Sequence, residues 1–364
     1  MKCLPVTKLE EGMVVGKTIY TSDGRPLLRR GTVLERRHIE RLKNLGIPVI
    51  YVEENLVRAE VEEAIMDGVR VSAVQEARRI ILKVRKELKF YNKKVSEVDL
   101  SDDMERVKGV IDSLIKEVLK TKSALFSFID IRGVDDFLYS HMVNVTVLGM
   151  MTGLSLGYKP DKLFLLGVGL FLHDIGKAII DDVVLANQKL FDRETNPMII
   201  KHPLIGYELI KGIPGVSLLS AHVAYQHHER VDGEGYPRGL SGSEIHEFAK
   251  IASVVNAYDI LVSGSPFHPR VKPSEAVDMI KGKVRSFFDK DVVEALLKNI
   301  ALYPVGSVVK LSTGELAMVS QTKKGFPDRP IVRILKDQED RDLDVSVEID
   351  LSFRDDISIV GVIE

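Results

Sequence analysis

The segment LFLHDIGKAI, residues 170–179, places two polar side chains that can bind metal directly at the end of an apolar helical pattern. The apolar residues lead into His173 and Asp174, and Gly176 and Lys177 follow. A glycine that ends the helix and a lysine at the negative end of its dipole would explain the last two residues. They do not explain an imidazole and a carboxylate at the end of an apolar face, so His173 and Asp174 are candidate site residues.

Composition narrows the class of protein. The chain of 364 residues is long enough for two or three domains, and its 45% hydrophobic and 29% charged content is typical of a globular protein. A net charge of -2 gives no polycation, so we expect no DNA or RNA partner. The single cysteine, Cys3, excludes an intrachain disulfide and a cysteine-based zinc site. The apolar stretches 143–156 and 163–172 are too short to cross a bilayer, so we expect a cytoplasmic protein without membrane association.

The spacing of apolar residues changes along the chain and predicts a mainly α fold with four parts. Residues 1–55 predict a small mixed α/β accessory domain, and residues 56–122 predict amphipathic connecting helices. Residues 123–300 are helical and contain the candidate site, and residues 301–364 predict a β-rich C-terminal appendage. The stripes on the connecting helices are most simply core, but they could also pack between subunits, so we expect a homodimer.

The histidines are concentrated in the third part, and only His38 lies before it. His141 lies on a predicted helix with Asn144 one turn later, and His202 precedes Pro203, which suits the first turn of a helix. His227 and His228 are adjacent, so on one helix they point about 100° apart and share a site only at its mouth or across two ions. Each of these histidines alone could be a core or capping residue.

Taken together, five imidazoles and one carboxylate from four segments indicate a nitrogen-rich site for divalent transition metals. Magnesium and calcium would require more oxygen ligands. Such a site activates water and binds oxyanions, as in two-metal hydrolysis of phosphate esters. Lys177 lies one turn after His173 and could contact a non-bridging phosphate oxygen.

The ordered motifs HMVNV, HDIGK and HHERVDGEGYP resemble the HD-GYP family, a branch of the HD-domain phosphohydrolases, over about residues 125–300. This resemblance implies an all-α HD-type domain that holds two or three iron, manganese or similar ions. It also implies hydrolysis of cyclic di-GMP to the linear dinucleotide and often on to GMP. The first and last parts of the chain are similar to segments found beside this domain.

The resemblance assigns roles by position. His141, His173 and Asp174 would hold one ion, and Asp174 would bridge to a second ion held by His202, His227 and His228. Lys177 would contact the scissile phosphate or the hydroxide. Tyr236 would lie on the loop that shapes the substrate pocket or meets a partner protein. Turn-favouring residues around Tyr236 predict that this loop is exposed and not part of a regular element.

Two positions and one segment depart from the family pattern. Asn256 stands where the family has an aspartate ligand. Asp259, one turn later, could reach into the site, but we expect it to be a hydrogen-bonding partner of a ligand histidine or of the neighbouring backbone. Phe137 stands where members with a third ion have a glutamate, so we expect two ions. Residues 263–268 lack the basic side chains that grip the nucleotide, and Arg270 and Lys272 could substitute.

We therefore expect a metal-dependent phosphodiesterase of cyclic di-GMP with two divalent ions, iron or manganese, per chain. The alternative is a degenerate HD-GYP protein that acts as a nucleotide receptor or a protein-interaction module with little or no catalysis. Hydrolysis of another nucleotide is a third interpretation. Retention of all five imidazoles favours catalysis, since unliganded imidazoles are costly to bury, whereas Asn256 and Ser265 favour the receptor.

Overall fold

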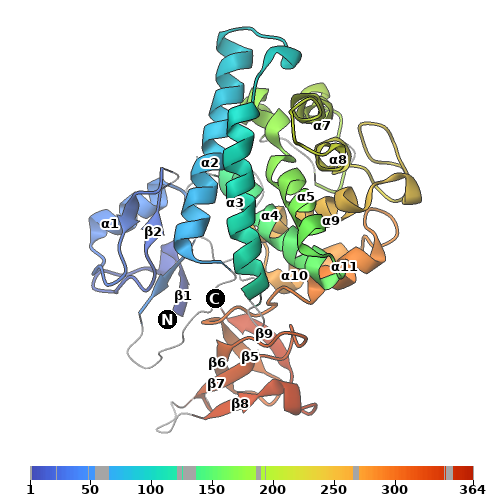
Figure 1. Cartoon of the computed structure of the whole chain (residues 1–364). Coiled ribbons are helices and arrows are strands. Elements are labelled where there is room, and N and C mark those ends of the chain that lie inside the picture. Colours follow the sequence, from blue (N-terminus) through green and yellow to red (C-terminus); the bar gives the residue numbers. More distant parts are fainter. Residues whose placement is uncertain are drawn as a thin grey trace.

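The computed structural model describes residues 2–21, 23–47, 49–53, 65–120, 125, 137–185, 190–192, 194–264, 270–339, 341 and 347–363. Figure 1 shows a small N-terminal unit, a helical centre and a C-terminal β-sheet. The predicted fold class is confirmed, because the centre is all helical and the C-terminal part is built on a five-stranded sheet.

The N-terminal unit has its own small hydrophobic core, which includes Val15, Leu34, Leu42 and Ile50. It contains two antiparallel strand pairs, one of which encloses the Asp23–Gly24 turn. Its elements are β1 (Lys2–Pro5), η1 (Val6–Lys8), β2 (Ile19–Tyr20), β3 (Pro26–Leu28), α1 (Arg36–Asn44) and β4 (Val49–Val52).

Two long helices, α2 and α3, lie side by side along one flank of the helical centre (Figure 1). Their apolar faces belong to the same continuous core as the helices that follow, since Ile80 and Ile111 share that core with residues as distant as Ile300. The elements of this flank are α2 (Asp67–Arg85), the π-helix η2 (Lys86–Phe90), η3 (Val95–Glu97) and α3 (Ser101–Lys120).

The central helix is α4, in which every residue from 139 to 153 is buried. It contacts α2, α5, α9 and α11, so its few polar side chains must find partners inside the protein. The remaining elements are α4 (Phe137–Ser155), α5 (Pro160–Leu172), η5 (Ile175–Ile179), α6 (Asp182–Leu185), α7 (Pro197–Ile210), α8 (Leu218–Gln226), η6 (Gly242–Glu244), α9 (Glu247–Ser263), α10 (Pro273–Lys281) and α11 (Lys290–Leu297).

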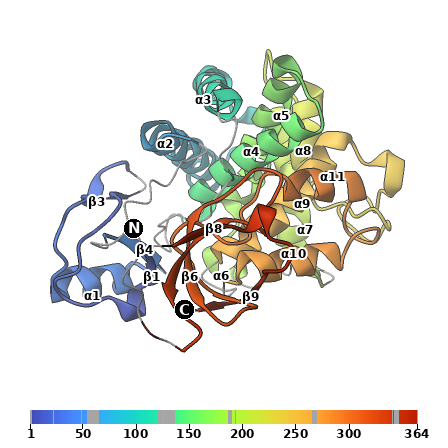
Figure 2. The same cartoon turned by 90° about the horizontal axis from the view of Figure 1, so that it is seen from below.

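The C-terminal sheet is antiparallel, with the strand order β8-β7-β6-β5-β9. Figure 2 shows this sheet from below, in red, in front of the helical centre. Alternating burial along β7 leaves Val332 and Ile334 on the inner face, where they pack in a separate core with Val309 and Leu351. The elements are β5 (Val308–Leu311), β6 (Leu316–Gln321), β7 (Ile331–Lys336), β8 (Glu348–Asp350), η7 (Leu351–Phe353) and β9 (Ile359–Ile363).

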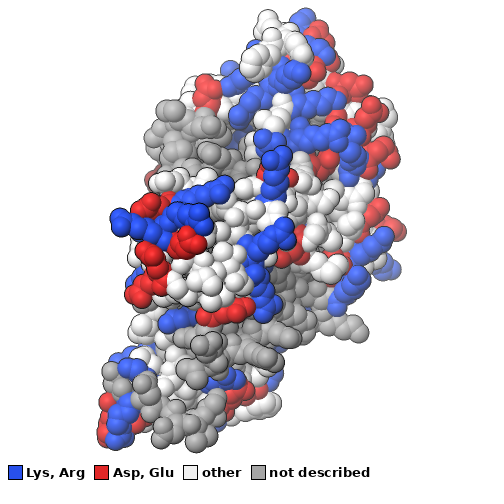
Figure 3. Space-filling view, turned by 90° about the vertical axis from the view of Figure 1, so that its left-hand side faces the viewer, with Lys and Arg blue, Asp and Glu red and all other residues white. Residues whose placement is uncertain are grey.

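The surface carries both signs of charge. On the face seen in Figure 3, Lys and Arg gather toward the upper end and are interspersed with Asp and Glu. Among the helices that the structure describes, none is long and apolar enough to cross a membrane.

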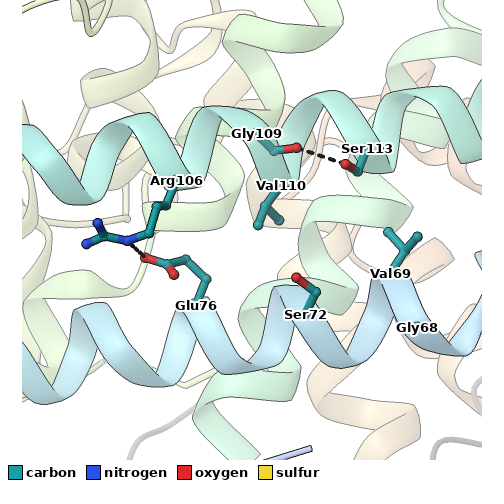
Figure 4. A pocket seen from close by; sticks show the side chains of 8 residues that line it. All are labelled: Gly68, Val69, Ser72, Glu76, Arg106, Gly109, Val110 and Ser113. Carbon is teal, nitrogen blue, oxygen red and sulfur yellow. Dashed lines mark hydrogen bonds and ion pairs between the residues drawn. The ribbon is translucent and has the colours of Figure 1, made fainter.

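A groove of about 420 Å³ lies between α2 and α3 (Figure 4). An ion pair between Arg106 Nε and Glu76 Oε1, 3.2 Å apart, crosses it. Small side chains such as those of Ser72 and Ser113 line the groove and leave space in it. All its lining residues belong to α2 and α3. The groove is therefore separate from the buried histidines described below.

Candidate metal centre

Four helical segments bring the predicted site residues together around one carboxylate. Asp174 belongs to two groups of donor atoms, and within each group the atoms lie within 4.8 Å of one another. The first group is Asp174 with His141 and His173, and the second is Asp174 with His202, His227 and His228.

Each carboxylate oxygen of Asp174 faces a different pair of imidazoles. Oδ2 lies 3.5 Å from His141 Nε2 and 3.4 Å from His173 Nε2. Oδ1 lies 3.4 Å from His202 Nε2 and 3.4 Å from His227 Nε2. Because these separations exceed a normal hydrogen bond, the arrangement leaves room for a bridging role between two ions.

Lys177 is buried beside this carboxylate, and its Nζ lies 2.7 Å from Asp174 Oδ2. The interpretation of Gly176 and Lys177 as mere helix-ending residues is therefore wrong. Helix α5 ends at Leu172, and both residues lie in η5. A Cβ on Gly176 would lie 2.1 Å from the backbone oxygen of His202, so the glycine lets η5 pack directly on α7.

Helix ends orient two of the imidazoles. His173 follows the last residue of α5, and its Nδ1 donates to the carbonyl of Leu170 at 2.7 Å. His227 follows the last residue of α8, and its Nδ1 donates to the carbonyl of Ala224 at 2.9 Å. The last carbonyls of a helix lack the N–H donor four residues later that the other carbonyls have, so they can accept these bonds.

His202 achieves the same orientation in the middle of a helix. The prediction that Pro203 lies in the first turn is wrong, because Asn196 caps α7 and Pro197 begins it. Pro203 has no N–H to donate to the carbonyl of Ile199, four residues earlier. His202 Nδ1 donates to that carbonyl instead, at 2.6 Å.

His141 has a side-chain partner. It lies within α4, and its Nδ1 lies 2.6 Å from Asp259 Oδ2 on α9. Asp259 Oδ1 also accepts hydrogen bonds from Asn144 Nδ2 at 2.8 Å and from Ser263 Oγ at 3.0 Å. Asp259 is thus a hydrogen-bonding partner of a site histidine, as expected.

The hydrogen bonds fix which nitrogen of each ring faces the cluster. A carbonyl or an ionised carboxylate only accepts, so Nδ1 carries the proton in all four rings and Nε2 of the neutral ring carries a lone pair. His202 Nε2 and His227 Nε2 then face each other at 3.3 Å as two lone pairs. Nε2 of His141, His173 and His228 is buried without a hydrogen-bond partner among the described residues. Converging lone pairs of this kind fit a cation.

The electrostatic environment keeps most of the rings neutral. Burial lowers the pKa of His202 and of His227 to about 4, and it also lowers the pKa of His173 and of His228. His141 differs, because although burial alone would lower its pKa, the nearby carboxylates of Asp174 and Asp259 raise it.

Asp174 remains ionised in this environment. Burial opposes its charge, but Lys177 and the surrounding histidines hold its pKa well below its ordinary value. The site therefore combines four imidazoles whose neutral form is favoured with one anionic oxygen donor, and divalent metals bind neutral imidazoles and ionised carboxylates.

Asn256 and Phe137 occupy the positions that the sequence singled out. Asn256 is buried on α9 one turn before Asp259, and its Oδ1 has no hydrogen-bond partner among the described residues. Phe137 begins α4 and stacks on His141. Residues 265–269, which include Ser265 and His268, lie outside the described residues.

Tyr236 lies on an irregular loop, as predicted, but it is only partly exposed. Its ring stacks on His228, with centroids 4.6 Å apart. A Cβ on Gly235 would lie 2.6 Å from the backbone oxygen of His228, so the glycine allows this close approach. The buried carboxylate of Glu229 accepts hydrogen bonds from the backbone of Arg238 and Leu240 and ties the loop down.

Two predicted substrate-binding residues lie at the junction before α10. Arg270 is partly exposed, and Lys272 Nζ donates to the carbonyl of Val362 in β9 at 3.4 Å. Lys272 thus connects the helical centre to the C-terminal sheet, and a substrate role for either residue stays a prediction. No pattern in the sequence points to Arg70, which lies on α2 and whose Nη1 donates to Asn144 Oδ1 at 2.9 Å.

Comparison with known proteins identifies two parts of the chain. Residues 131–292 match the HD domain family, and residues 308–364 match the KOW domain associated with HD domain. An HD domain implies divalent-metal binding, and the His–Asp cluster supplies the donors.

Two relatives of this chain are named as cyclic di-GMP phosphodiesterases. Cyclic di-GMP phosphodiesterase PA4108 of Pseudomonas aeruginosa is 27% identical over 338 residues, which cover 88% of this chain and 81% of the relative. Cyclic di-GMP phosphodiesterase response regulator RpfG of Xanthomonas campestris pv. campestris is 37% identical over 148 residues, 40% of this chain but only 39% of the relative. Among solved structures, the HDG"Y"P protein Bd1817 of Bdellovibrio bacteriovorus has a TM-score of 0.47 at 18% identity, covering 81% of this chain and 97% of that chain.

Proposed function

Because the chain belongs to the HD-domain proteins of the HD-GYP type, we propose that it is a metal-dependent phosphodiesterase that hydrolyses cyclic di-GMP to the linear dinucleotide. The observation that carries the proposal is the position of Asp174 between two sets of imidazoles, with Lys177 Nζ 2.7 Å from its Oδ2. A shared carboxylate between two donor sets is the arrangement of a two-metal phosphoesterase site.

The proposed cofactor is a pair of divalent ions, iron or manganese. His141 and His173 would hold one ion, and His202, His227 and His228 would hold the other, with Asp174 common to both. Nitrogen-rich donor sets favour transition metals over magnesium or calcium. When bound, the ions would supply a nucleophilic hydroxide and Lewis-acid polarisation of the phosphate.

The chain's own residues would orient the substrate and balance charge. Lys177 is buried and cationic, so it is suited to a non-bridging phosphate oxygen at the cost of its contact with Asp174. The ring of Tyr236, stacked on His228, would form one wall of the substrate pocket. The loop around Tyr236 is also the proposed surface for a protein partner, and we propose that the protein is a homodimer.

Asn256 favours a second function, that of a nucleotide receptor with little catalysis. An amide oxygen in place of a carboxylate removes one negative charge from the His141 side of the site. A weakly bound ion there would leave the binding of nucleotide intact but slow its hydrolysis.

Purification under anaerobic conditions, followed by metal analysis and incubation with cyclic di-GMP, separates the two functions. We expect metal-loaded protein to convert cyclic di-GMP to the linear product, which chromatography detects. We expect Asp174→Asn protein to be inactive. Asp181→Asn is the matched control, because Asp181 is an exposed partner of Lys89 just beyond η5. Tight binding of cyclic di-GMP by fully loaded protein without any product would establish the receptor and overturn the enzyme.

The same assay tests the substrate. Two other relatives are 3'3'-cGAMP-specific phosphodiesterases of Vibrio cholerae, which match 27% and 23% of aligned residues. With both dinucleotides at equal concentration, we expect faster cleavage of cyclic di-GMP, and faster cleavage of 3'3'-cGAMP would reassign the substrate.

A further inference from the structure

His141 depends on other helices for its orientation, unlike the three rings whose Nδ1 donates to a backbone carbonyl of their own helix. The acceptors for His173, His202 and His227 lie three residues earlier in each case. The acceptor for His141 is the carboxylate of Asp259 on α9, a side chain that must itself be held in place.

A chain of hydrogen bonds continues beyond Asp259 to α2. Asn144 Nδ2 donates to Asp259 Oδ1 at 2.8 Å, and Arg70 Nη1 donates to Asn144 Oδ1 at 2.9 Å. Asn144 is buried and Arg70 is partly buried, so solvent competes little for the inner bond.

The donors and acceptors allow this series of hydrogen bonds to run in one direction only. A guanidinium has donors and no acceptor, so Asn144 must turn its oxygen toward Arg70 and its amide nitrogen toward Asp259. An amide turned the other way would place two donors against each other at Arg70 and two acceptors at Asp259. Arg70 therefore sets the amide orientation that holds Asp259, and Asp259 holds the proton on His141 Nδ1. The lone pair on His141 Nε2 is left pointing into the cluster.

Helix α2 meets the candidate centre at a second place. Arg85 Nε, near its other end, donates to the carbonyl of Ala178 in η5 at 3.0 Å, directly after Lys177. On its outer side α2 meets the N-terminal unit, where Gln75 Nε2 donates to the carbonyl of Asp23 at 2.8 Å. Helix α2 thus contacts α4, which carries His141, η5, which carries Lys177, and the N-terminal unit.

We propose that Arg70 is a positioning residue for His141 and acts through Asn144 and Asp259. The inference rests on the proposed role of His141 as a metal ligand. It implies that α2 helps to orient a ligand of the proposed metal centre. Loss of a partner that orients a ligand histidine typically lowers metal affinity about 10- to 100-fold.

The test is the affinity of metal-free, full-length protein for Mn²⁺, measured by calorimetric titration. We expect Arg70→Gln to weaken one of the two binding events about 10-fold or more. Arg70→Lys, which keeps a cationic donor, should restore part of the loss. Arg79→Gln is the matched control, because Arg79 is an exposed arginine on the same helix that pairs only weakly with Glu76 at 3.6 Å. Wild-type affinity in Arg70→Gln protein would overturn the proposal.

A double variant distinguishes positioning from packing. If Arg70 acts through Asn144, then Arg70→Gln has no further effect on Mn²⁺ affinity in an Asn144→Ala background, because the chain is already broken. A merely structural contribution of Arg70 would persist there undiminished, and that result would overturn the proposal. Should Arg70→Gln fail to fold, Asn144→Ala alone must still weaken the site, and unchanged affinity would be equally decisive.

The metal titration separates this inference from the proposed function. Arg70-dependent Mn²⁺ binding without hydrolysis of cyclic di-GMP would refute the enzyme and leave the positioning role standing. If hydrolysis requires Asp174 but the Mn²⁺ affinity is unchanged in the Arg70 and Asn144 variants, the proposed function stands and the positioning role of Arg70 is refuted.

Discussion

The ring of Phe137 stacks on the ring of His141, with centroids 5.5 Å apart and planes inclined by 13°. Phe137 lies one turn before His141 on α4, where a third ion would need a carboxylate, and a phenyl ring cannot ligate. We therefore expect at most two ions per chain at saturating Mn²⁺, counted by mass spectrometry of the metal after gel filtration. Phe137→Glu should raise the count, and Phe137→Leu should not. Three ions in the wild-type chain would contradict this account.

Asp174 should be required for both ions, because each of its oxygens faces a different pair of imidazoles. Asp174→Asn removes the only negative charge of the two donor groups. We expect at least a 10-fold loss of affinity at both sites and protein that stays folded, as judged by circular dichroism. The exposed change Asp181→Asn should leave the metal content unchanged. Two ions retained at full occupancy in Asp174→Asn protein would show that the carboxylate does not bridge.

Asn256→Asp should strengthen metal binding on the His141 side. The amide oxygen of Asn256 is buried without a hydrogen-bond partner among the described residues. A carboxylate in its place would also lack a donor, so only a cation or a new donor could compensate its charge. We expect Mn²⁺ affinity to rise about 10-fold or more, and hydrolysis of cyclic di-GMP to rise with it. Asn196→Asp adds the same charge at the N-cap of α7 and should change neither. If both variants behave like wild type, Asn256 is not a defect in the site.

Pro203→Ala should weaken metal binding without weakening the fold. Alanine would supply the N–H that competes with His202 Nδ1 for the carbonyl of Ile199. Since a carbonyl can accept two hydrogen bonds, we expect only about a 3- to 10-fold loss of Mn²⁺ affinity. Alanine also has the higher helix propensity, so the metal-free chain should be at least as stable in urea. Pro273→Ala, at the first turn of α10, is the control that should not affect metal.

The metal-free protein should lose stability in mild acid. Burial lowers the pKa of His202 and of His227 to about 4 in the fold, whereas histidine in an unfolded chain titrates near 6.5. Between these values the unfolded chain binds more protons, so the free energy of unfolding falls as the pH drops from 6.5 toward 4.

The size of this effect is about 1.4 kcal/mol per pH unit for each extra proton. Asp174 adds nothing in this window, since its pKa is held below its ordinary value of 3.8 and its contribution is lost only at lower pH. Urea unfolding of metal-free protein at pH 7.5, 6.5, 5.5 and 4.5 measures the slope. His202→Gln should flatten it, and a stability independent of pH would contradict neutral burial of these rings.

Much of this protein follows from local patterns in its sequence. Apolar runs that lead into His173 and Asp174, together with clustered histidines, predicted a helical core around a polar site. The helical centre and the C-terminal sheet both formed as the periodicity indicated. Turn-forming residues also predicted the irregular loop that carries Tyr236, because glycine and proline act on their own backbone.

Only the tertiary structure decided how the site is oriented. Pro203 and Gly176 look like residues that begin and end helices, yet one frees a carbonyl for His202 and the other lets α7 approach η5. Tyr236 was expected to be exposed, but its ring packs on His228. Arg70 lies 74 residues from Asn144 in the sequence, so the residues next to Arg70 in the sequence do not predict their hydrogen bond. The physical reason is range: residue type and spacing act within a few turns of helix, whereas the direction of a lone pair is set by whichever distant donor the packed helices bring beside it.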